Sequence, residues 1–287
     1  MAPVQAHSQI TIPIVMIVIG AGALHAIWNA IAKYVDDGLV VFALIGVAST
    51  VGGALTLAIT GLPYRASIGY AAASAAIHIG YDLGLMNSYR LGSFNQVYPI
   101  ARGTSPLVVA VGAYFLAGED LGPVPLAGVA ILAAGLASLA LSSGRITRSE
   151  MPAVGVAVLT GLTIAGYTIV DGLGVRHSHD PYAYAGLLFA LQGPVFVVVA
   201  AFRRPGFTWL TGAAAGKGLL AGALSLVAYG TVLWAQTQAP LAEVAAIRET
   251  GVVFAALIGM KLFSEHFGTR RLAAALVVAA GIVLISA

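Results

Sequence analysis

Residues 38–60 read GLVVFALIGVASTVGGALTLAIT and contain no charged side chain. A helix needs about 20 predominantly apolar residues to cross the hydrocarbon core of a bilayer, so this stretch is predicted to be a membrane-spanning helix. The connections beside it, VDDG and GLPYR, are short and rich in glycine, proline and charge, which is typical of turns. The same alternation continues along the chain and predicts ten spans. They lie near residues 13–33, 38–60, 67–89, 93–117, 122–142, 151–173, 182–202, 213–236, 240–262 and 268–286.

The composition supports a membrane protein. Hydrophobic residues make up 59% of the 287 residues, charged residues make up 9%, and the mean hydropathy is +0.94. A soluble domain carries roughly 25% charged residues, so this chain has too few charges to cover a water-facing surface. The N-terminal MAPVQAHSQITIP lacks the basic region and cleavage site of a signal peptide, so the first apolar stretch is expected to remain as a span. The predicted fold class is all-α integral membrane.

The cysteine count and the motif content exclude several kinds of chemistry. The chain has no cysteine, which excludes disulfides, thiol catalysis and cysteine-ligated metals. It has no nucleophile-elbow, zinc-protease or Walker motif, so no enzyme activity and no cofactor are expected. His177 and His179 stand beside Asp180 in a predicted loop, where a solvated turn is favoured over a metal site. A net charge of +3 gives no indication of a nucleic-acid partner.

The distribution of lysine and arginine predicts the orientation, because cytoplasmic loops carry an excess of both. The connections after spans 1, 3, 5, 7 and 9 hold ten of these residues, and the connections on the opposite side hold two, Arg65 and Arg176. The protein is therefore expected in a cell inner membrane with both termini outside the cytoplasm. The ten residues assigned to the cytoplasmic side are Lys33, Arg90, Arg145, Arg148, Arg203, Arg204, Lys217, Lys261, Arg270 and Arg271.

The sequence also repeats itself at an offset of 146 residues. Arg102-Gly-Thr corresponds to Arg248-Glu-Thr, and each arginine stands seventeen residues before a glutamate, Glu119 or Glu265, at a helix end. A weaker echo relates the segment from Gly22 to Trp28 to the segment from Gly161 to Tyr167. Five spans in each half is an odd number, so the halves are predicted to enter the membrane with opposite orientations. Inverted repeats of this kind are a transporter architecture with the site between the halves. The alternative is a coincidence between two low-complexity helices.

The closing part of each half resembles the EamA repeat of the drug/metabolite transporter (DMT) superfamily. The first copy runs from Thr104-Ser-Pro106 to Gly118-Glu119 and then through an apolar helix that ends at Gly135. The second copy has Val252 in place of Pro106, and it continues through Ser264-Glu265 to Gly281. The resemblance covers the whole chain as two EamA-like repeats, residues 1–146 and 147–287. It implies a ten-span bacterial exporter that works by alternating access, with a cavity lined mainly by spans 1, 3, 4, 6, 8 and 9.

Polar side chains inside predicted spans are candidate pathway residues, because placing them in the bilayer is costly. In span 3, His78 and Asp82 lie one turn apart and are predicted either to exchange protons or to form a structural hydrogen bond. In span 9, Glu243 and Glu249 face different ways, so one acid is expected to pair with an arginine of the other half. The remaining candidates are His25, Trp28, Asn29, Tyr81, Tyr98, Arg102, Tyr167, Tyr229 and Arg248. Glu119 and Glu265 are expected to cap nearby helix N-termini.

These candidates indicate a zwitterionic cargo. Arginine provides a planar fork suited to a carboxylate, an acid can meet an ammonium group, and the tyrosine rings can contact an apolar side chain. The sequence therefore predicts export of neutral or aromatic amino acids by a monomer or weak oligomer, with protons as the candidate coupling ion. The alternatives are an exporter of drugs or organic cations, a sugar or nucleotide-sugar carrier and, from another class, an intramembrane enzyme or lipid-modifying protein. Glycines four residues apart, Gly212 with Gly216 and Gly218 with Gly222, predict close helix packing.

Overall fold

The computed structural model describes residues 10–35, 37–91, 94–141, 147–204, 206, 208–263 and 269–286, and every regular element in these ranges is a helix. The first half contains α1 (Ile12–Tyr34), α2 (Gly38–Thr60), α3 (Arg65–Leu91), α4 (Phe94–Gly112) with a π-helical turn (Ala113–Ala117), and α5 (Pro123–Leu141). The second half contains α6 (Met151–Arg176), α7 (Pro181–Arg203), α8 (Gly212–Gln236), α9 (Leu241–Arg248), α10 (Gly251–Phe263) and α11 (Thr269–Ile285). Short 3-10 turns, Arg148–Glu150 and Thr208–Leu210, precede α6 and α8.

The helices coincide with the apolar stretches of the sequence. Six segments among the described residues are long and apolar enough to cross a membrane, whereas α5 and α11 carry shorter apolar segments. The helix α3 is not among the six, and it carries several polar side chains, including His78 and Asp82. The six segments are Ile12–Lys33, Gly38–Thr60, Tyr98–Ala117, Arg148–Arg176, Pro181–Arg203 and Ala214–Gln236.

The ninth apolar stretch, predicted as one helix, is divided into α9 and α10. The backbone N–H of Thr250 donates to the Ile247 carbonyl at 3.0 Å, and this tight turn interrupts the α-helical pattern. The helix α1 passes close to this break. A Cβ at Gly22 would lie 2.8 Å from the Arg248 carbonyl, and a Cβ at Gly251 would lie 2.6 Å from the Gly22 carbonyl. The break therefore places Arg248 and Glu249 at the junction of two short helices.

Glycines bring α2 and α7 into backbone contact. A Cβ at Gly53 would lie 2.6 Å from the Gly186 carbonyl, and a Cβ at Gly193 would lie 2.6 Å from the Gly46 carbonyl. Small residues at such crossings allow helices to pack closely in a membrane, where dispersion and backbone contacts drive association.

The glycine pairs of α8 differ in role. Gly218 and Gly222 pack as predicted, since an added Cβ would lie 2.5 Å from Leu44 or Ala48 side-chain atoms of α2. The prediction is wrong for Gly212 and Gly216, where an added Cβ would meet open space. Gly212 begins the helix with a positive φ of 84°. Glycine adopts this backbone conformation without strain, which explains why a glycine occupies the position.

Four connections meet at one end of the bundle. The Tyr64 backbone N–H donates to the Ser178 carbonyl at 3.1 Å. Arg176 pairs with Glu119 at 2.6 Å and donates to the carbonyls of Gln236 and Ala239, both at 2.9 Å. These contacts bring the connections after α2, α4, α6 and α8 together at the same end of the bundle.

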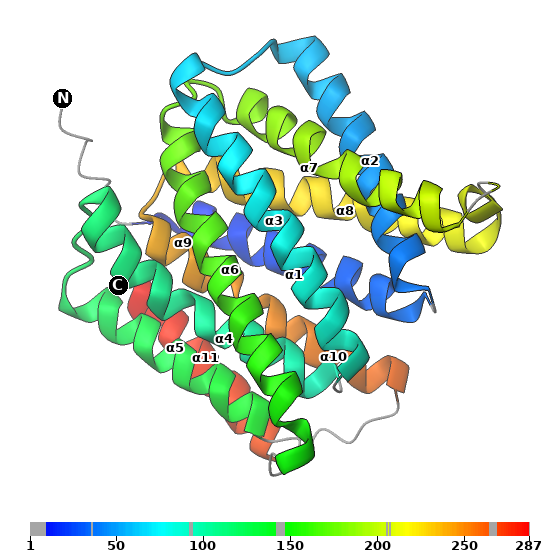
Figure 1. Ribbon diagram of the computed structural model, residues 1–287. Helices are drawn as coiled ribbons and strands as arrows, with labels where there is room; N and C mark the ends of the chain where they lie inside the picture. The colour runs from blue at the N-terminus through cyan, green and yellow to red at the C-terminus, as the bar shows by residue number, and fades with distance from the viewer. Residues whose placement is uncertain are drawn as a thin grey trace.

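The helices form one bundle with two distinct edges. Figure 1 shows α5 and α11 side by side along one edge, and α2, α7 and α8 at the opposite edge. Between the edges, α3 packs on α6 and α1 packs on α8, so helices of the two halves alternate in space. The centre of the bundle is therefore built from both halves of the chain.

Candidate functional site

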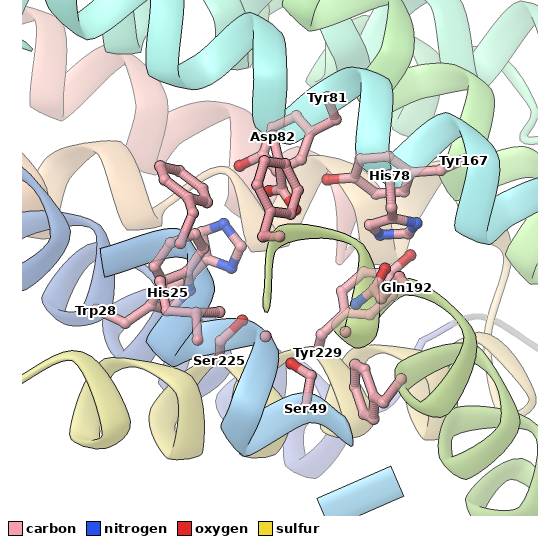
Figure 2. Close-up of a pocket in the computed structure, with 16 residues that line it drawn as sticks. His25, Trp28, Ser49, His78, Tyr81, Asp82, Tyr167, Gln192, Ser225 and Tyr229 are labelled. Atoms are coloured by element: carbon pink, nitrogen blue, oxygen red, sulfur yellow. The ribbon is translucent and has the colours of Figure 1, made fainter. Parts of the chain in front are cut away.

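A cavity lies where α1, α2 and α3 of the first half face α6, α7 and α8 of the second half. About 40 Å³ of it is open to the centres of water molecules, which is room for about three waters. Figure 2 shows the labelled side chains arranged around this central space. Seven residues predicted from the sequence line it: His25, Trp28, His78, Tyr81, Asp82, Tyr167 and Tyr229.

The helices that line the cavity differ in part from those that the family resemblance implied. Spans 4 and 9 were expected to contribute, but α2 and α7 take their place in the lining. Arg102 of α4 instead forms a buried ion pair with Glu249, at the end of α9, beside the cavity. Sequence reasoning missed the polar residues Ser49 of α2, Gln192 of α7 and Ser225 of α8, because each stands in a long apolar stretch without a charged residue.

Aromatic rings form one wall of the cavity. The His78 ring stacks on the Tyr167 ring with centroids 3.9 Å apart. The rings of Tyr81 and Tyr229 meet Tyr167 edge-on, at 5.4 Å and 5.7 Å between centroids. On α1, His25 meets Trp28 edge-on at 5.0 Å between centroids. Such a wall suits a flat or apolar group.

Hydrogen bonding fixes the tautomer of neutral His78. Its Nδ1 lies 3.0 Å from the Ser74 carbonyl, which can only accept, so Nδ1 carries the hydrogen. The other ring nitrogen, Nε2, is then an acceptor. His78 and Asp82 line the same cavity, and no hydrogen bond joins them among the described residues; the direct partner of His78 is Ser74 on its own helix.

Three buried polar atoms of cavity-lining residues have no hydrogen-bond partner among the described residues. They are Nε2 of His25, Nε1 of Trp28 and Oε1 of Gln192. A buried polar atom left unsatisfied costs about 1–3 kcal/mol. Half-buried Asp82 adds a carboxylate to the same lining, again with no ion-pair partner in the described ranges. The cavity therefore presents polar groups that a bound polar molecule can satisfy.

A fully buried ion cluster lies next to the aromatic wall. Glu249 Oε1 accepts from Arg102 Nη1 of the other half at 3.1 Å and from Arg248 Nη2 at 3.2 Å. The pairing of a span-9 acid with an arginine of the other half agrees with the prediction from the sequence. Two guanidinium groups against one carboxylate leave an excess positive charge. The Arg248 guanidinium lies 5.9 Å from the centroid of Tyr167, so this ring stands between the cluster and the cavity.

The other predicted residues lie away from the cavity lining. Tyr98 lies beside the ion cluster, with the Arg102 guanidinium 5.5 Å from its ring. Asn29 is buried in α1 and donates to the His25 carbonyl at 2.8 Å. Glu243 accepts from the backbone N–H of Ile10 at 3.3 Å. Arg102, Arg248 and Glu249 face one another.

Asp171 was overlooked in the sequence, although it is an acid inside a predicted span, close to the end of that span. It is fully buried in α6 and accepts hydrogen bonds from Tyr184 of α7, at 2.8 Å, and from Tyr229 of α8. The rule that selected Asp82 as a candidate applies equally to Asp171, so the signal was present. Tyr229 links this carboxylate to the cavity that it lines.

The glutamates at span ends and the loop histidines have structural partners. Both oxygens of Glu119 accept from the backbone N–H of Leu241, at 3.0 Å and 2.8 Å, which confirms the predicted cap at the start of α9. Glu265 lies outside the described residues. The rings of His177 and His179 stack on tyrosines of the α2–α3 region, and the described ranges hold no group of three residues able to bind a metal ion.

Comparison with known proteins agrees with this picture. Residues 151–287 match the model of the EamA-like transporter family, so the second half of the chain is similar to a membrane transporter domain. One solved structure, described as "Crystal structure of protein", shares 15% identity and a TM-score of 0.74, over 95% of this chain and 94% of that chain. This likeness shows that the two chains have the same fold. No curated protein matches the chain.

Proposed function

We propose that this protein is an EamA-type secondary transporter that exports small metabolites, with neutral and aromatic amino acids as the main cargo, across the bacterial inner membrane. It is built of two inverted five-span repeats, residues 1–146 and 147–287, and works by alternating access. The observation that carries the proposal is the cavity between the halves, lined by aromatic rings, Asp82 and three buried polar atoms without partners.

The helix contacts support an inverted repeat. If each helix of one half is exchanged for its counterpart in the other, the pair α3–α6 becomes α8–α1, and α2–α7 becomes itself. All of these pairs are in contact. The glycines follow the same exchange: Gly22 of α1 packs on the Arg248 carbonyl, and Gly161 of α6 packs on the Ala101 carbonyl, beside Arg102. The carboxylates of Asp37 and Asp180 likewise cap α2 and α7 at 2.8–3.2 Å.

The charges around the cavity suit a zwitterion. Asp82 supplies a carboxylate for an ammonium group, and the rings of Trp28, Tyr81 and Tyr167 supply an apolar wall. The ion cluster behind Tyr167 has an excess positive charge, which favours a carboxylate at that end of the cavity. A molecule with one charge of each sign complements both the Asp82 carboxylate and the positive ion cluster.

The small size of the cavity supports alternating access. Room for about three waters is too little for an amino acid, so cargo binding requires the lining helices to separate. The lining comes from both halves of the chain, and relative movement of the halves changes its width. A rocking motion about a fixed site is the mechanism typical of transporters with inverted repeats.

A specific observation favours a second candidate function, export of organic cations. Asp82 lines the cavity, whereas Arg102 and Arg248 are withdrawn behind the aromatic wall. An acid with aromatic rings is a suitable site for a lipophilic cation. The two functions differ in whether the cargo needs a carboxylate.

Counterflow with purified protein in liposomes tests the proposal. Labelled phenylalanine, leucine, a sugar and an organic cation are compared, and phenylalanine is expected to exchange fastest. Asp82→Asn is expected to reduce phenylalanine exchange at least tenfold, because the cavity loses its contact for the ammonium group. Asp120→Asn, an exposed acid in the connection before α5, serves as the matched control and should exchange normally. Rapid exchange of the cation without phenylalanine exchange would favour the second candidate, and exchange of the sugar alone would refute both.

A further inference from the structure

Asp171 is a buried carboxylate that no cation neutralises directly. Its side chain has no exposed surface, and none of the ion pairs among the described residues includes it. Tyr184 Oη donates to one carboxylate oxygen at 2.8 Å, and Tyr229 Oη donates to the other. Ser74 of α3 lies close to this carboxylate. These donors stabilise the ionised form without removing its charge.

The groups that face Asp171 come from five helices. Arg248 of α9 lies nearby, but its Nη2 donates to Thr168, one turn before Asp171 on α6, at 3.3 Å, and to Glu249. His78 of α3 stands behind Ser74, to which its Nδ1 is hydrogen-bonded. The titratable and charged groups around the carboxylate are therefore Tyr70 and His78 of α3, Tyr167 of α6, Tyr184 of α7, Tyr229 of α8 and Arg248 of α9.

An unpaired negative charge inside a membrane protein is costly, and binding a proton removes it. We propose that Asp171 binds the proton that is exchanged for cargo, and that Tyr229 transmits its protonation state to the cavity. The inference rests on the transport function proposed above. It assigns the proton to a residue outside the His78 and Asp82 pair that the sequence suggested.

Tyr229 is suited to this role because it belongs to two sites. Its hydroxyl bonds Asp171, and its side chain lines the cavity, with its ring edge-on to His78 at 5.2 Å. Tyr184 bonds the same carboxylate but does not line the cavity. Both tyrosines therefore donate a hydrogen bond to Asp171, but only Tyr229 can also contact cargo in the cavity.

Protonation of Asp171 reverses the direction of its hydrogen bond with Tyr229. When Asp171 is ionised, Tyr229 donates its hydrogen to the carboxylate, and the lone pairs of its oxygen are available to an ammonium N–H in the cavity. When a proton from the aqueous phase binds Asp171, the carboxylic acid donates to the Tyr229 oxygen. The tyrosine hydroxyl hydrogen then turns toward the cavity, where it repels the N–H groups of an ammonium. Proton and amine therefore compete, and one proton enters for each amine that leaves.

Infrared difference spectroscopy tests the proton site without any cargo. The wild-type protein in liposomes is titrated, and a carboxylic-acid C=O band is expected to appear as the pH falls. One component of this band should be absent in Asp171→Asn and present in Asp82→Asn. The C–O stretch of Tyr229, identified by its loss in Tyr229→Phe, should shift over the same pH range. A band unchanged in Asp171→Asn, or a tyrosine signal that does not follow it, overturns the proposal.

A binding measurement tests the link to cargo, with labelled L-phenylalanine as the probe. In the wild type the apparent Kd should rise by about tenfold for each pH unit below the midpoint of the Asp171 band, as expected for competition with one proton. Tyr229→Phe should flatten this dependence, and the matched variant Tyr184→Phe should keep it. Equal behaviour of the two variants overturns the role of Tyr229. If phenylalanine does not bind at any pH, the proposed cargo is refuted, and the infrared result still decides the proton site.

Discussion

The buried ion cluster allows a quantitative prediction for Glu249→Gln. The change is nearly isosteric, but it leaves Arg102 and Arg248 facing each other without a carboxylate. The two N–O distances are 3.1 Å and 3.2 Å. At an effective dielectric constant of about 20, each pair contributes about 5 kcal/mol of Coulomb attraction. Relaxation reduces the measured cost of breaking a buried pair to about 3–5 kcal/mol. We expect Glu249→Gln to destabilise the fold by this amount.

The excess charge of the cluster predicts an asymmetry between its members. Arg102→Met removes one guanidinium and leaves the Arg248–Glu249 pair intact, so it should cost less than Glu249→Gln. The double variant, Arg102→Met with Glu249→Gln, should recover about 0.5–3 kcal/mol relative to the sum of the single changes, because the like-charge contact is lost.

Thermal unfolding in detergent, followed by tryptophan fluorescence at one fixed scan rate, measures these effects. At about 2–3 °C per kcal/mol, Glu249→Gln should lower Tm by about 6–15 °C. Arg102→Met should give a smaller decrease. A Glu249→Gln protein with the Tm of the wild type, or an Arg102→Met protein less stable than Glu249→Gln, would show that the cluster does not hold the halves together electrostatically.

Three further predictions concern orientation and packing. An impermeant thiol reagent applied to intact cells should label Asp120→Cys and leave Arg148→Cys unlabelled, and the reverse pattern would invert the orientation; the absence of native cysteine makes the readout clean. Gly193→Ala should destabilise by about 1–3 kcal/mol, because its Cβ would overlap the backbone of α2, whereas Gly216→Ala in open space should be neutral or stabilising; similar Tm values for both would contradict the packing. Glu119→Gln should lower Tm by loosening the start of α9 and its contact to Arg176, and an unchanged Tm would show that the pair contributes nothing.

The sequence predicted the helices well because hydrophobic length is a local property. The helix α2 occupies residues 38–60, as predicted, and most other ends differ by a few residues. The division of the ninth stretch lies where Gly22 approaches from a helix more than 200 residues earlier in the chain. Such a contact leaves no mark on the local pattern of residues 240–262.

The cavity was predicted in part. The polar faces of α1 and α3 selected His25, His78 and Asp82 as candidates, and all three line the cavity. The helices α2 and α7 line the cavity largely through apolar side chains and glycines, and such a lining cannot be distinguished in sequence from a lipid-facing surface. Asp171 could have been selected from its sequence environment, whereas its two tyrosine partners depend on the packing of α6 against α7 and α8.

The packing of helices of one half against helices of the other half has a consequence for the synthesis of the protein. Since α1 packs on α8 and α3 packs on α6, neither half can bury its inner faces while it is alone. During synthesis the first five helices enter the membrane before the second half has been made. Their polar side chains, including Arg102, therefore lack their final partners at that stage. Arg102 acquires its carboxylate only when Glu249, nearly 150 residues later, has been inserted. Completion of the fold is therefore a late event in biogenesis, and a chain truncated before α9 is expected to be recognised by membrane quality control as unassembled.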